Sequence, residues 1–423
     1  MSAVFFFYFF LFAFWLENVV GFQLTSIRGL SLLNISYYFL LFVWVVSIIK
    51  KRIVFERNAV NKYIIGLFIV IFFSIPVKFI LNEVDDIYLL NELVSLKGWL
   101  NPVLLFFVIY NTVNNKKHGM LILFGLIFFF AVTILGSLAA YFGLSGFASA
   151  KIIKGRIAGF AEPNQFAAYL VLFFPLLLSG ILFLSGSKRV LSLCFFCLAL
   201  VVLLLTGSRG GILSLFFCIF VYFIAFSKKK LVNPVVLVVS IFVLVPIFFA
   251  SSYVIMTDET RGKVISRLNP SETSDAYEYT SGRTELWRNG FQLFLESPLY
   301  GHGQATFTPL MKKKFPIWGN SHNDYLLYLV QYGIIGLIVF VAIFFVLFRE
   351  SWRMSRMSHD RSITILALSY FSGLAGFALA AAGVNIIQPL YLFWAYSAVV
   401  LRQGDFLGSD FVNTSQGVHD AYC

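Results

Sequence analysis

Long runs of hydrophobic residues, separated by short polar stretches, dominate the chain. Runs of about 17 to 25 apolar residues are long enough to cross a bilayer as helices. About twelve occur, at residues 3–20, 30–49, 63–81, 92–113, 119–145, 165–185, 190–206, 211–227, 231–254, 323–348, 362–382 and 385–401. The pattern predicts an all-α integral membrane protein with about twelve transmembrane helices.

Basic residues follow every second run. The clusters are "KKRIVFER", "NNKKH", "SKR", "KKK" and "RESWRMSRMSHDR", and Arg402 follows the last run. Cytoplasmic loops of membrane proteins are enriched in Lys and Arg. The alternation therefore predicts that both termini are cytoplasmic and that the remaining loops lie on the outer face.

The lengths of the polar stretches divide the chain into four parts. Residues 1–254 hold the first nine predicted helices, and residues 255–320 form one large loop on the outer face. Residues 321–401 hold the last three helices, and residues 402–423 form a polar cytoplasmic tail that we expect to be disordered. Within the loop, apolar residues recur at helical spacing from Arg283 to Glu296, which predicts an amphipathic helix on the membrane surface.

Composition supports a lipid environment and argues against nucleic acid as a partner. The chain is 59% hydrophobic and only 12% charged, whereas soluble proteins carry about 25% charged residues. The formal net charge of +12 comes mainly from the basic clusters described above. The large loop is nearly charge-balanced, so it does not form a basic surface of the kind that binds nucleic acid.

Some cations do not follow this alternation, because they fall in loops predicted on the outer face. They are Lys151, Lys154 and Arg156 before the sixth run, Arg209 within "TGSRGG", and Arg283 and Arg288 in the large loop. A single arginine of this kind is explained by solvation or by lipid headgroups. Several on one face favour an anion site, because arginine holds phosphate bidentately and glycines let backbone N–H groups approach it.

The stretch "GRIAGFAEPNQFAAYL" predicts the start of the sixth helix. Glu162, Pro163 and Asn164 stand where that helix begins, and proline is favoured in the first turn. Glu162 is placed to pair with Arg156 or with a substrate hydroxyl. A purely structural role at the helix start is an equally good interpretation.

The stretch "SHNDYLLYLVQYGIIG" opens the tenth predicted helix with polar residues. Ser321 to Asp324 matches the S-x-x-D capping box, which places His322 in the first turn on the outer face. The positive end of a helix disfavours a charged imidazole and suits a general base. Gly333 and Gly336 fall on the same helical stripe, where they would let a neighbouring helix pack closely. A histidine at the interface above packing glycines is the alternative, and His302 in "SPLYGHG" is a secondary candidate.

The same residues resemble a known family. His322 and Asn323, followed after nine residues by Gly333 and Gly336, are similar to the signature of the O-antigen ligase and polymerase family of bacterial membrane glycosyltransferases. The segments "GRIAGFAEPNQFA", "TGSRGG" and "GRTELWRNGFQLFLESPLYGHG" resemble that family in kind, order and spacing. The resemblance covers most of residues 155–336, and the first five predicted helices match only in being hydrophobic.

The resemblance implies a twelve-helix protein of the bacterial cytoplasmic (inner) membrane, with its active site on the periplasmic face. The implied donor is a glycan on undecaprenyl pyrophosphate, the acceptor is a second glycan or the lipid A core, and neither a metal nor a cofactor is needed. Arg156 and Arg209 would then hold the pyrophosphate, Arg283 would assist, and His322 would activate or orient the acceptor. The supporting positions are Glu162, Asn164, Asn323, Gly333 and Gly336.

Several alternatives remain at this stage. Ligase and polymerase differ only in the acceptor, which the motifs do not specify. A protein O-glycosyltransferase is less favoured, since only a short tail follows Arg402. A flippase or other transporter is less favoured, because transporters usually carry ionisable groups near mid-membrane and these spans are nearly free of them, with Lys78 as the clearest exception. The adjacent Asp85 and Asp86 do not by themselves favour a metal site.

Overall fold

The structure is a computed structural model that describes residues 3–22, 24, 31–53, 55–81, 89–144, 152–153, 155–231, 282–315, 317, 319–386 and 390–419. Almost all of the predicted ninth helix and much of the large loop lie outside these residues. Lys151, Lys154, Asp85 and Asp86 lie outside them as well.

The described chain is almost entirely helical, which confirms the all-α prediction. Eight of its helices are long and apolar enough to span a membrane. They are α2 (Leu32–Ile49), α3 (Asn61–Leu81), α5 (Lys116–Tyr141), α6 (Pro163–Phe183), α7 (Gly186–Leu205), α8 (Arg209–Lys228), α14 (Asp324–Met357) and α15 (Arg361–Ala381). The count of twelve stays a prediction.

Three further predicted spans also coincide with helices. They are α1 (Ala3–Trp15) with its continuation η1 (Leu16–Val20), α4 (Leu89–Thr112) and α16 (Leu390–His419). The helix α16 is described from Leu390, and residues 382–386 form the turn that follows α15, so the predicted start at 385 is wrong. It also continues past Arg402, so the segment predicted as a disordered tail begins as helix.

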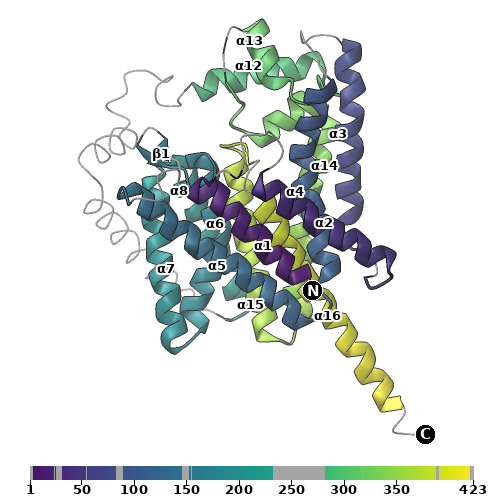
Figure 1. Ribbon diagram of the computed structural model, residues 1–423, viewed down its shortest axis with the longest axis vertical. Helices are drawn as coiled ribbons and strands as arrows, with labels where there is room; N and C mark the ends of the chain where they lie inside the picture. Colours follow the sequence, from purple (N-terminus) through teal and green to yellow (C-terminus); the bar gives the residue numbers. More distant parts are fainter. Residues whose placement is uncertain are drawn as a thin grey trace.

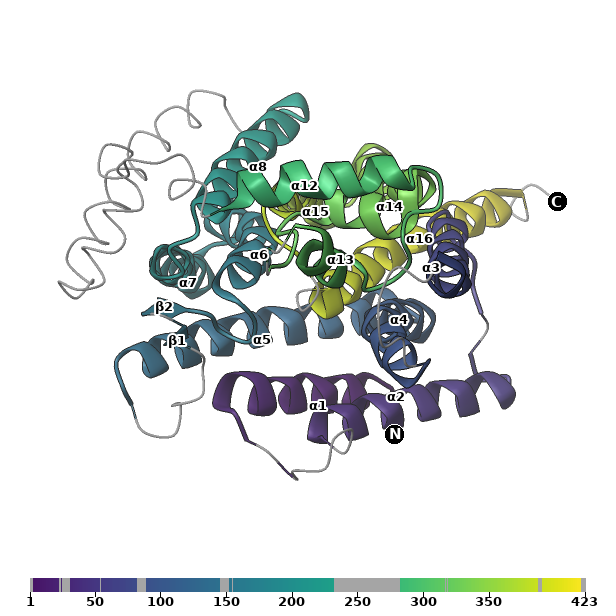
Figure 2. The same ribbon diagram turned by 90° about the horizontal axis from the view of Figure 1, so that it is seen from above.

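The helices α6, α8 and α15 pack on one another, and α6 and α15 are the most buried of the spans (Figure 1). Two glycines of α15 allow this close approach. A Cβ atom at Gly373 would lie 2.2 Å from the carbonyl oxygen of Leu172, and one at Gly376 would lie 2.5 Å from the side chain of Val171. The helix α14 packs on α15 and α3, whereas α16 packs on α4 and α5. Seen from above, α1 and α2 form an outer layer beside α4 and α5 (Figure 2).

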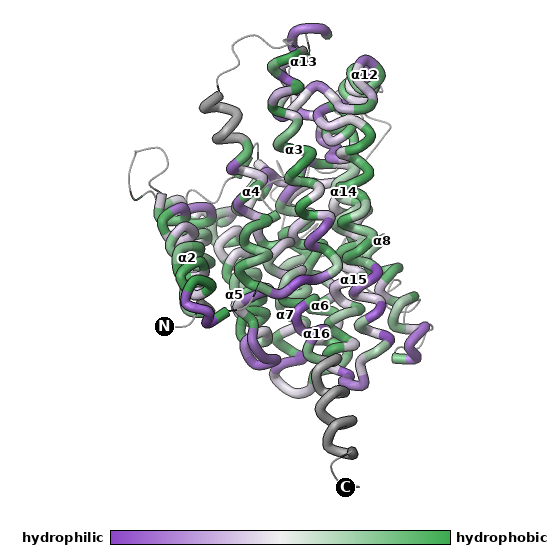
Figure 3. The backbone as a smooth tube through the Cα atoms, turned by 90° about the vertical axis from the view of Figure 1, so that its right-hand side faces the viewer, coloured by the Kyte–Doolittle hydropathy of each residue, from purple (hydrophilic) through white to green (hydrophobic). Residues whose placement is uncertain are grey.

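Polar residues gather at the two ends of this bundle, with hydrophobic stretches along the helices between them (Figure 3). One end, called here the α12 end, carries α12 (Arg283–Glu296), α13 (Phe307–Lys314) and a short hairpin of β1 (Ile152–Ile153) and β2 (Arg156–Ile157). The opposite end carries the last turns of α14 and the segment before α3. This grouping agrees with the alternation of loops that the basic clusters predict.

The helix α12 has the bounds that its apolar spacing predicts. Only part of its apolar face meets the protein: Leu286 and Leu293 are buried in a small core with α13 and the start of α14. Phe291 and Leu295 remain 50% and 59% exposed. The helix is therefore docked on the bundle through one side while a second apolar strip faces outward.

The helix α14 is broken at Gly333, whose φ of 65° and ψ of −166° are not helical. The loop 298–303 binds the break through three backbone hydrogen bonds: His302 N to Val330 O (2.9 Å), Gly303 N to Gln331 O (2.9 Å) and Ile334 N to Pro298 O (2.8 Å). A Cβ atom at Gly333 would lie 2.2 Å from the carbonyl oxygen of Leu299. The prediction of a continuous stripe packed by a neighbouring helix is wrong, because the backbone of this loop takes that place.

Candidate active site

Arg156 on β2 contacts two other segments that carry candidate site residues, the start of α6 and the turn between α7 and α8. Its Nε donates to the carbonyl oxygen of Thr206 (2.6 Å), and its Nη2 donates to Oδ1 of Asn164 (3.0 Å). Gly207 lies against this side chain with a φ of 56°, and a Cβ atom there would approach Arg156 Nε to 3.3 Å. The hairpin, the start of α6 and the α7–α8 turn therefore meet around one guanidinium.

The N-terminus of α8 begins beside this guanidinium. Ser208 caps the helix by accepting a hydrogen bond from Gly211 N at 3.1 Å, and Arg209 is the first helical residue. The amides of a first helical turn have no acceptor within the helix, and the helix dipole favours an anion in front of them. Gly210 is exposed, with no atom within 4 Å of the place a Cβ would occupy. The corner thus combines two arginines, a helix N-terminus and open space.

Arg283 reaches the same region from α12. Its Nη1 donates to the carbonyl oxygen of Gly383 at 2.8 Å, which ties α12 to the turn after α15. Burial and the positive charge of Arg209 lower the pKa of Arg283, and the carboxylate of Glu162 opposes that shift. Since these groups perturb one another, they lie within electrostatic range. An arginine nevertheless stays protonated in proteins.

His322 precedes α14 instead of lying in its first turn. The N-cap residue is Asn323, whose side chain accepts a hydrogen bond from Leu326 N at 3.1 Å, so the predicted cap at Ser321 is wrong. His322 has a φ of 47°, an uncommon left-handed conformation for a residue other than glycine. Its backbone N donates to Oδ1 of Asn385 at 3.0 Å, which helps to hold that conformation.

The surroundings of the His322 ring favour its neutral form. Burial lowers its pKa first, the positive charge of Arg283 lowers it further, and Glu162 opposes both. The direction agrees with the predicted neutral imidazole. The physical cause differs from the one predicted, because burial and a neighbouring arginine contribute in addition to any effect of the helix terminus.

Asn385 organises this turn, and the sequence reasoning missed it. Its Nδ2 donates to Ser321 Oγ (2.9 Å) and to Asp324 Oδ1 (3.0 Å), and Ile386 N donates to Asp324 Oδ2 (3.0 Å). Asp324 is only 2% exposed, so these donors satisfy a buried carboxyl group. Asn385 was the first residue of the predicted twelfth span, so it did not stand out as a loop residue. The available signal was the position of Asn385 at the edge of that span, four residues before Pro389, which indicates a turn before the helix.

His302, the secondary candidate, is held elsewhere. It is 2% exposed, and its Nε2 lies 2.7 Å from the carbonyl oxygen of Leu293. The histidine therefore belongs to the junction of α12 with the break in α14. Across the described ranges, no group of three or more His, Cys, Asp or Glu side chains could hold a metal ion.

These observations define a class of protein: a helical membrane protein with cations and a half-buried histidine gathered at one end. A family model described as O-antigen ligase matches residues 193–341. That segment includes Arg209, Arg283 and His322, and the match confirms the resemblance seen in the motifs. Arg156 and Glu162 precede the matched segment. No curated protein matches the chain significantly.

Proposed function

We propose that this protein is a glycosyltransferase that moves a glycan from undecaprenyl pyrophosphate to an acceptor hydroxyl on the outer face of the bacterial cytoplasmic membrane. One observation carries the proposal: Arg283 and Glu162 both act on the charge of His322, and Arg209 acts on that of Arg283, at the α12 end. The family match covers Arg209, Arg283 and His322. On this proposal the α12 end is the periplasmic end, and both termini are cytoplasmic.

The arginines would bind the donor's pyrophosphate. Arg156 is held by Thr206 and Asn164, Arg283 is held by Gly383, and Arg209 opens α8. As the bond to the sugar breaks, negative charge grows on the leaving pyrophosphate. Cations and helix amides that are already fixed stabilise that charge without reorganising, so the step needs no metal.

His322 would accept the acceptor's proton. The acceptor oxygen attacks the anomeric carbon, the carbon–oxygen bond to pyrophosphate breaks, and the hydroxyl proton passes to the neutral imidazole. Direct displacement of this kind inverts the anomeric centre. Glu162 would assist as a hydrogen-bond partner or by electrostatics. Asn323 and the break at Gly333, with Gly336 one turn further on, would position the turn that carries His322.

The acceptor is left open between lipid A core, for a ligase, and a second lipid-linked or exopolysaccharide chain, for a polymerase. Loss of all polymer on lipid A in a deletion strain, with lipid-linked polymer accumulating, would identify a ligase. Single repeat units still attached to lipid A would identify a polymerase.

The test uses the full chain in proteoliposomes with lipid-linked glycan and a defined acceptor. His322→Ala should abolish transfer without unfolding the protein, whereas His359→Ala, an exposed histidine at the opposite end, should transfer normally. Turnover should also survive EDTA. Normal transfer by His322→Ala would overturn its catalytic role. Movement of the lipid-linked glycan across the bilayer without a new glycosidic bond would instead favour the transporter alternative.

A further inference from the structure

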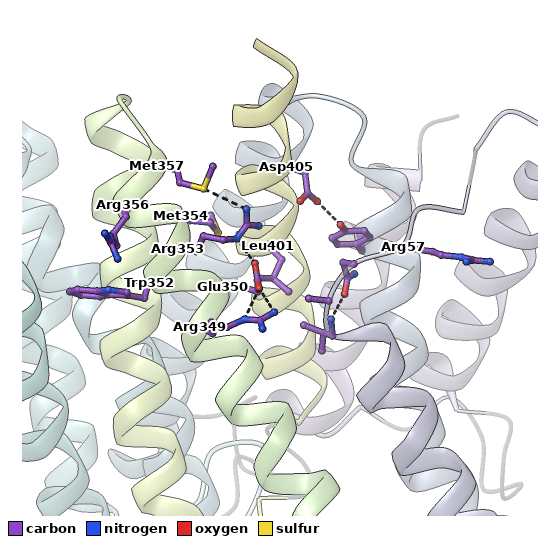
Figure 4. Close-up of a pocket in the computed structure, with 14 residues that line it drawn as sticks. Arg57, Arg349, Glu350, Trp352, Arg353, Met354, Arg356, Met357, Leu401 and Asp405 are labelled. Atoms are coloured by element: carbon purple, nitrogen blue, oxygen red, sulfur yellow. Dashed lines mark hydrogen bonds and ion pairs between the residues drawn. The ribbon is translucent and has the colours of Figure 1, made fainter. Parts of the chain in front are cut away.

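A pocket of about 860 Å³ adjoins the last turns of α14, and its lining residues are drawn in Figure 4. The last turns of α14 lie at the end of the molecule opposite to α12. Four parts of the chain line it: residues 57–60 before α3, Tyr110 of α4, the last turns of α14, and Leu401 and Asp405 of α16. Four arginines and two carboxylates are among the lining residues, so the pocket carries an excess of positive charge. Nothing in the proposed transfer reaction uses this end of the molecule.

One buried carboxylate organises two of these arginines. Glu350, whose side chain is 9% exposed, accepts hydrogen bonds from Arg349 Nη2 (2.8 Å) and from Arg353 Nε (2.6 Å). A guanidinium has five N–H donors, and these bonds use only part of each set. Glu350 therefore orients both arginines, and the pair keeps one net positive charge.

The other lining residues of the pocket indicate where an anion would bind. Asn58 lies beside Tyr110 in this wall, and the two side chains interact. Arg356 is exposed, and within the same residues it makes neither a hydrogen bond nor an ion pair. Asp405 is engaged by the hydroxyl of Tyr110, and Arg57 points away from the cluster in Figure 4. An anion would therefore bind on the α14 side of the pocket.

An apolar groove of about 330 Å³ shares one wall with this pocket. Trp352 lines both spaces, and Val221, Ile224 and Phe371 line the groove, with Lys228 at its edge. The rings of Trp352 and Phe371 lie 5.5 Å apart. On α8 the groove is lined from Lys228, the last residue of that helix, back to Val221, so it reaches roughly 10 Å from the helix end toward the middle of the bundle.

We infer that this composite site binds one anionic phospholipid of the leaflet at this end, which the basic clusters predict to be cytoplasmic. The phosphate would bind Arg353 and Arg356, and an acyl chain would follow the groove beyond Trp352. A soluble phosphate would use the arginines and leave the apolar groove unused. Arginines that serve topology alone need neither a shared carboxylate nor an adjoining groove.

The test titrates the purified full chain in detergent with phosphatidylglycerol and with phosphatidylcholine, and counts bound lipids by native mass spectrometry. The double substitution Arg353→Gln/Arg356→Gln should weaken phosphatidylglycerol binding on the order of 30-fold, at about fivefold per arginine. Arg356→Gln alone should weaken phosphatidylglycerol binding by about fivefold. Because Arg356 makes no described bond, that variant should fold normally.

The matched control is Lys51→Gln/Arg52→Gln, which removes two exposed cations before α3 outside the pocket. This control should bind phosphatidylglycerol as the unmodified protein does, and Trp352→Ala should weaken the lipid without weakening inorganic phosphate. Equal losses in control and pocket variants, or equal binding of the two lipids, would overturn the inference. Displacement of the lipid by millimolar inorganic phosphate would overturn it too, because the site would then serve a soluble anion.

Discussion

The two ends of the molecule both carry arginines, but they hold them in different ways. At the α12 end, Arg156 and Arg283 donate to backbone carbonyls and to an amide side chain. At the opposite end, Arg349 and Arg353 share the carboxylate of Glu350, and Arg402, 7% exposed, pairs with Glu56. These hydrogen bonds to neutral acceptors fix a guanidinium without cancelling its charge, whereas the bonds to Glu350 and Glu56 also cancel part of the charge.

This difference bears directly on function. A cation that must stabilise a developing charge is most useful when its position is fixed beforehand. A cation that holds helices together at a membrane surface is most stable next to a carboxylate. On the proposed function, the same residue type would bind the substrate at the α12 end, whereas at the opposite end it ties helices together. Substitutions that remove charge should affect transfer at the first end and stability at the second.

The largest expected effect is on transfer. Arg283→Gln should reduce turnover on the order of 10²–10³-fold, because one fixed donor to the leaving group is lost. Arg283→Lys should recover little, since a lysine lacks the planar fork. The measurement is initial rate in proteoliposomes, with Arg349→Gln at the opposite end as the matched control. Comparable losses in the two variants would erase the functional distinction between the ends.

The next effect is on stability at the α12 end. Gly333→Ala should lower the free energy of unfolding by about 3 kcal/mol, because φ there is 65° and a Cβ would meet the Leu299 carbonyl. Gly98→Ala is the control, since a Cβ at Gly98 would meet no atom within 4 Å. Unfolding can be followed in mixed micelles. An unchanged midpoint for Gly333→Ala would contradict the break in α14.

The helices and the break in α14 differ in how far local sequence could predict them. Apolar periodicity gave the bounds of α12, and the proline after Glu162 marked the start of α6, because both signals lie within the element itself. The break at Gly333 depends on hydrogen bonds from residues 298–303, which helical spacing does not reveal. The sequence pattern could show that a glycine was present but not what packs against it.

The candidate site shows the same division. Arg156, Arg209, Arg283 and His322 stood out as polar residues in unusual loops, and the structure gathers them at one end. The conformation of His322 depends on Asn385, which is 63 residues away and lay inside a predicted span. The cap at Asn323, and not at Ser321, follows from that contact, because Asn385 engages the Ser321 hydroxyl. Contacts at such separation are set by tertiary packing, which local spacing does not encode.

A smaller effect on stability is expected at the opposite end. Glu56→Gln should lower the free energy of unfolding by about 1–2 kcal/mol, because it leaves the buried guanidinium of Arg402 beside a neutral partner. The value is below that for a fully buried pair because Glu56 is partly exposed and solvent screens the charge. Transfer measured below the unfolding temperature should be unchanged. A loss of transfer without a loss of stability would mean that this end takes part in the reaction.

The smallest effect is a shift of the pH profile. Glu162 raises the pKa of His322 against the lowering by burial and Arg283. A general base must be neutral, so transfer should fall on the acid side as pH drops through the lowered pKa, below the ordinary value of about 6.5. Glu162→Gln removes the opposing charge, so the acid limb should move to still lower pH, as measured from kcat/KM against pH. Asp360→Asn, an exposed carboxylate at the opposite end, should leave the limb in place. A shift of the acid limb toward higher pH in Glu162→Gln would show that Glu162 and His322 are not coupled as the structure has them. An acid limb at the same pH in Glu162→Gln would show that His322 is not the base whose titration the pH profile reports.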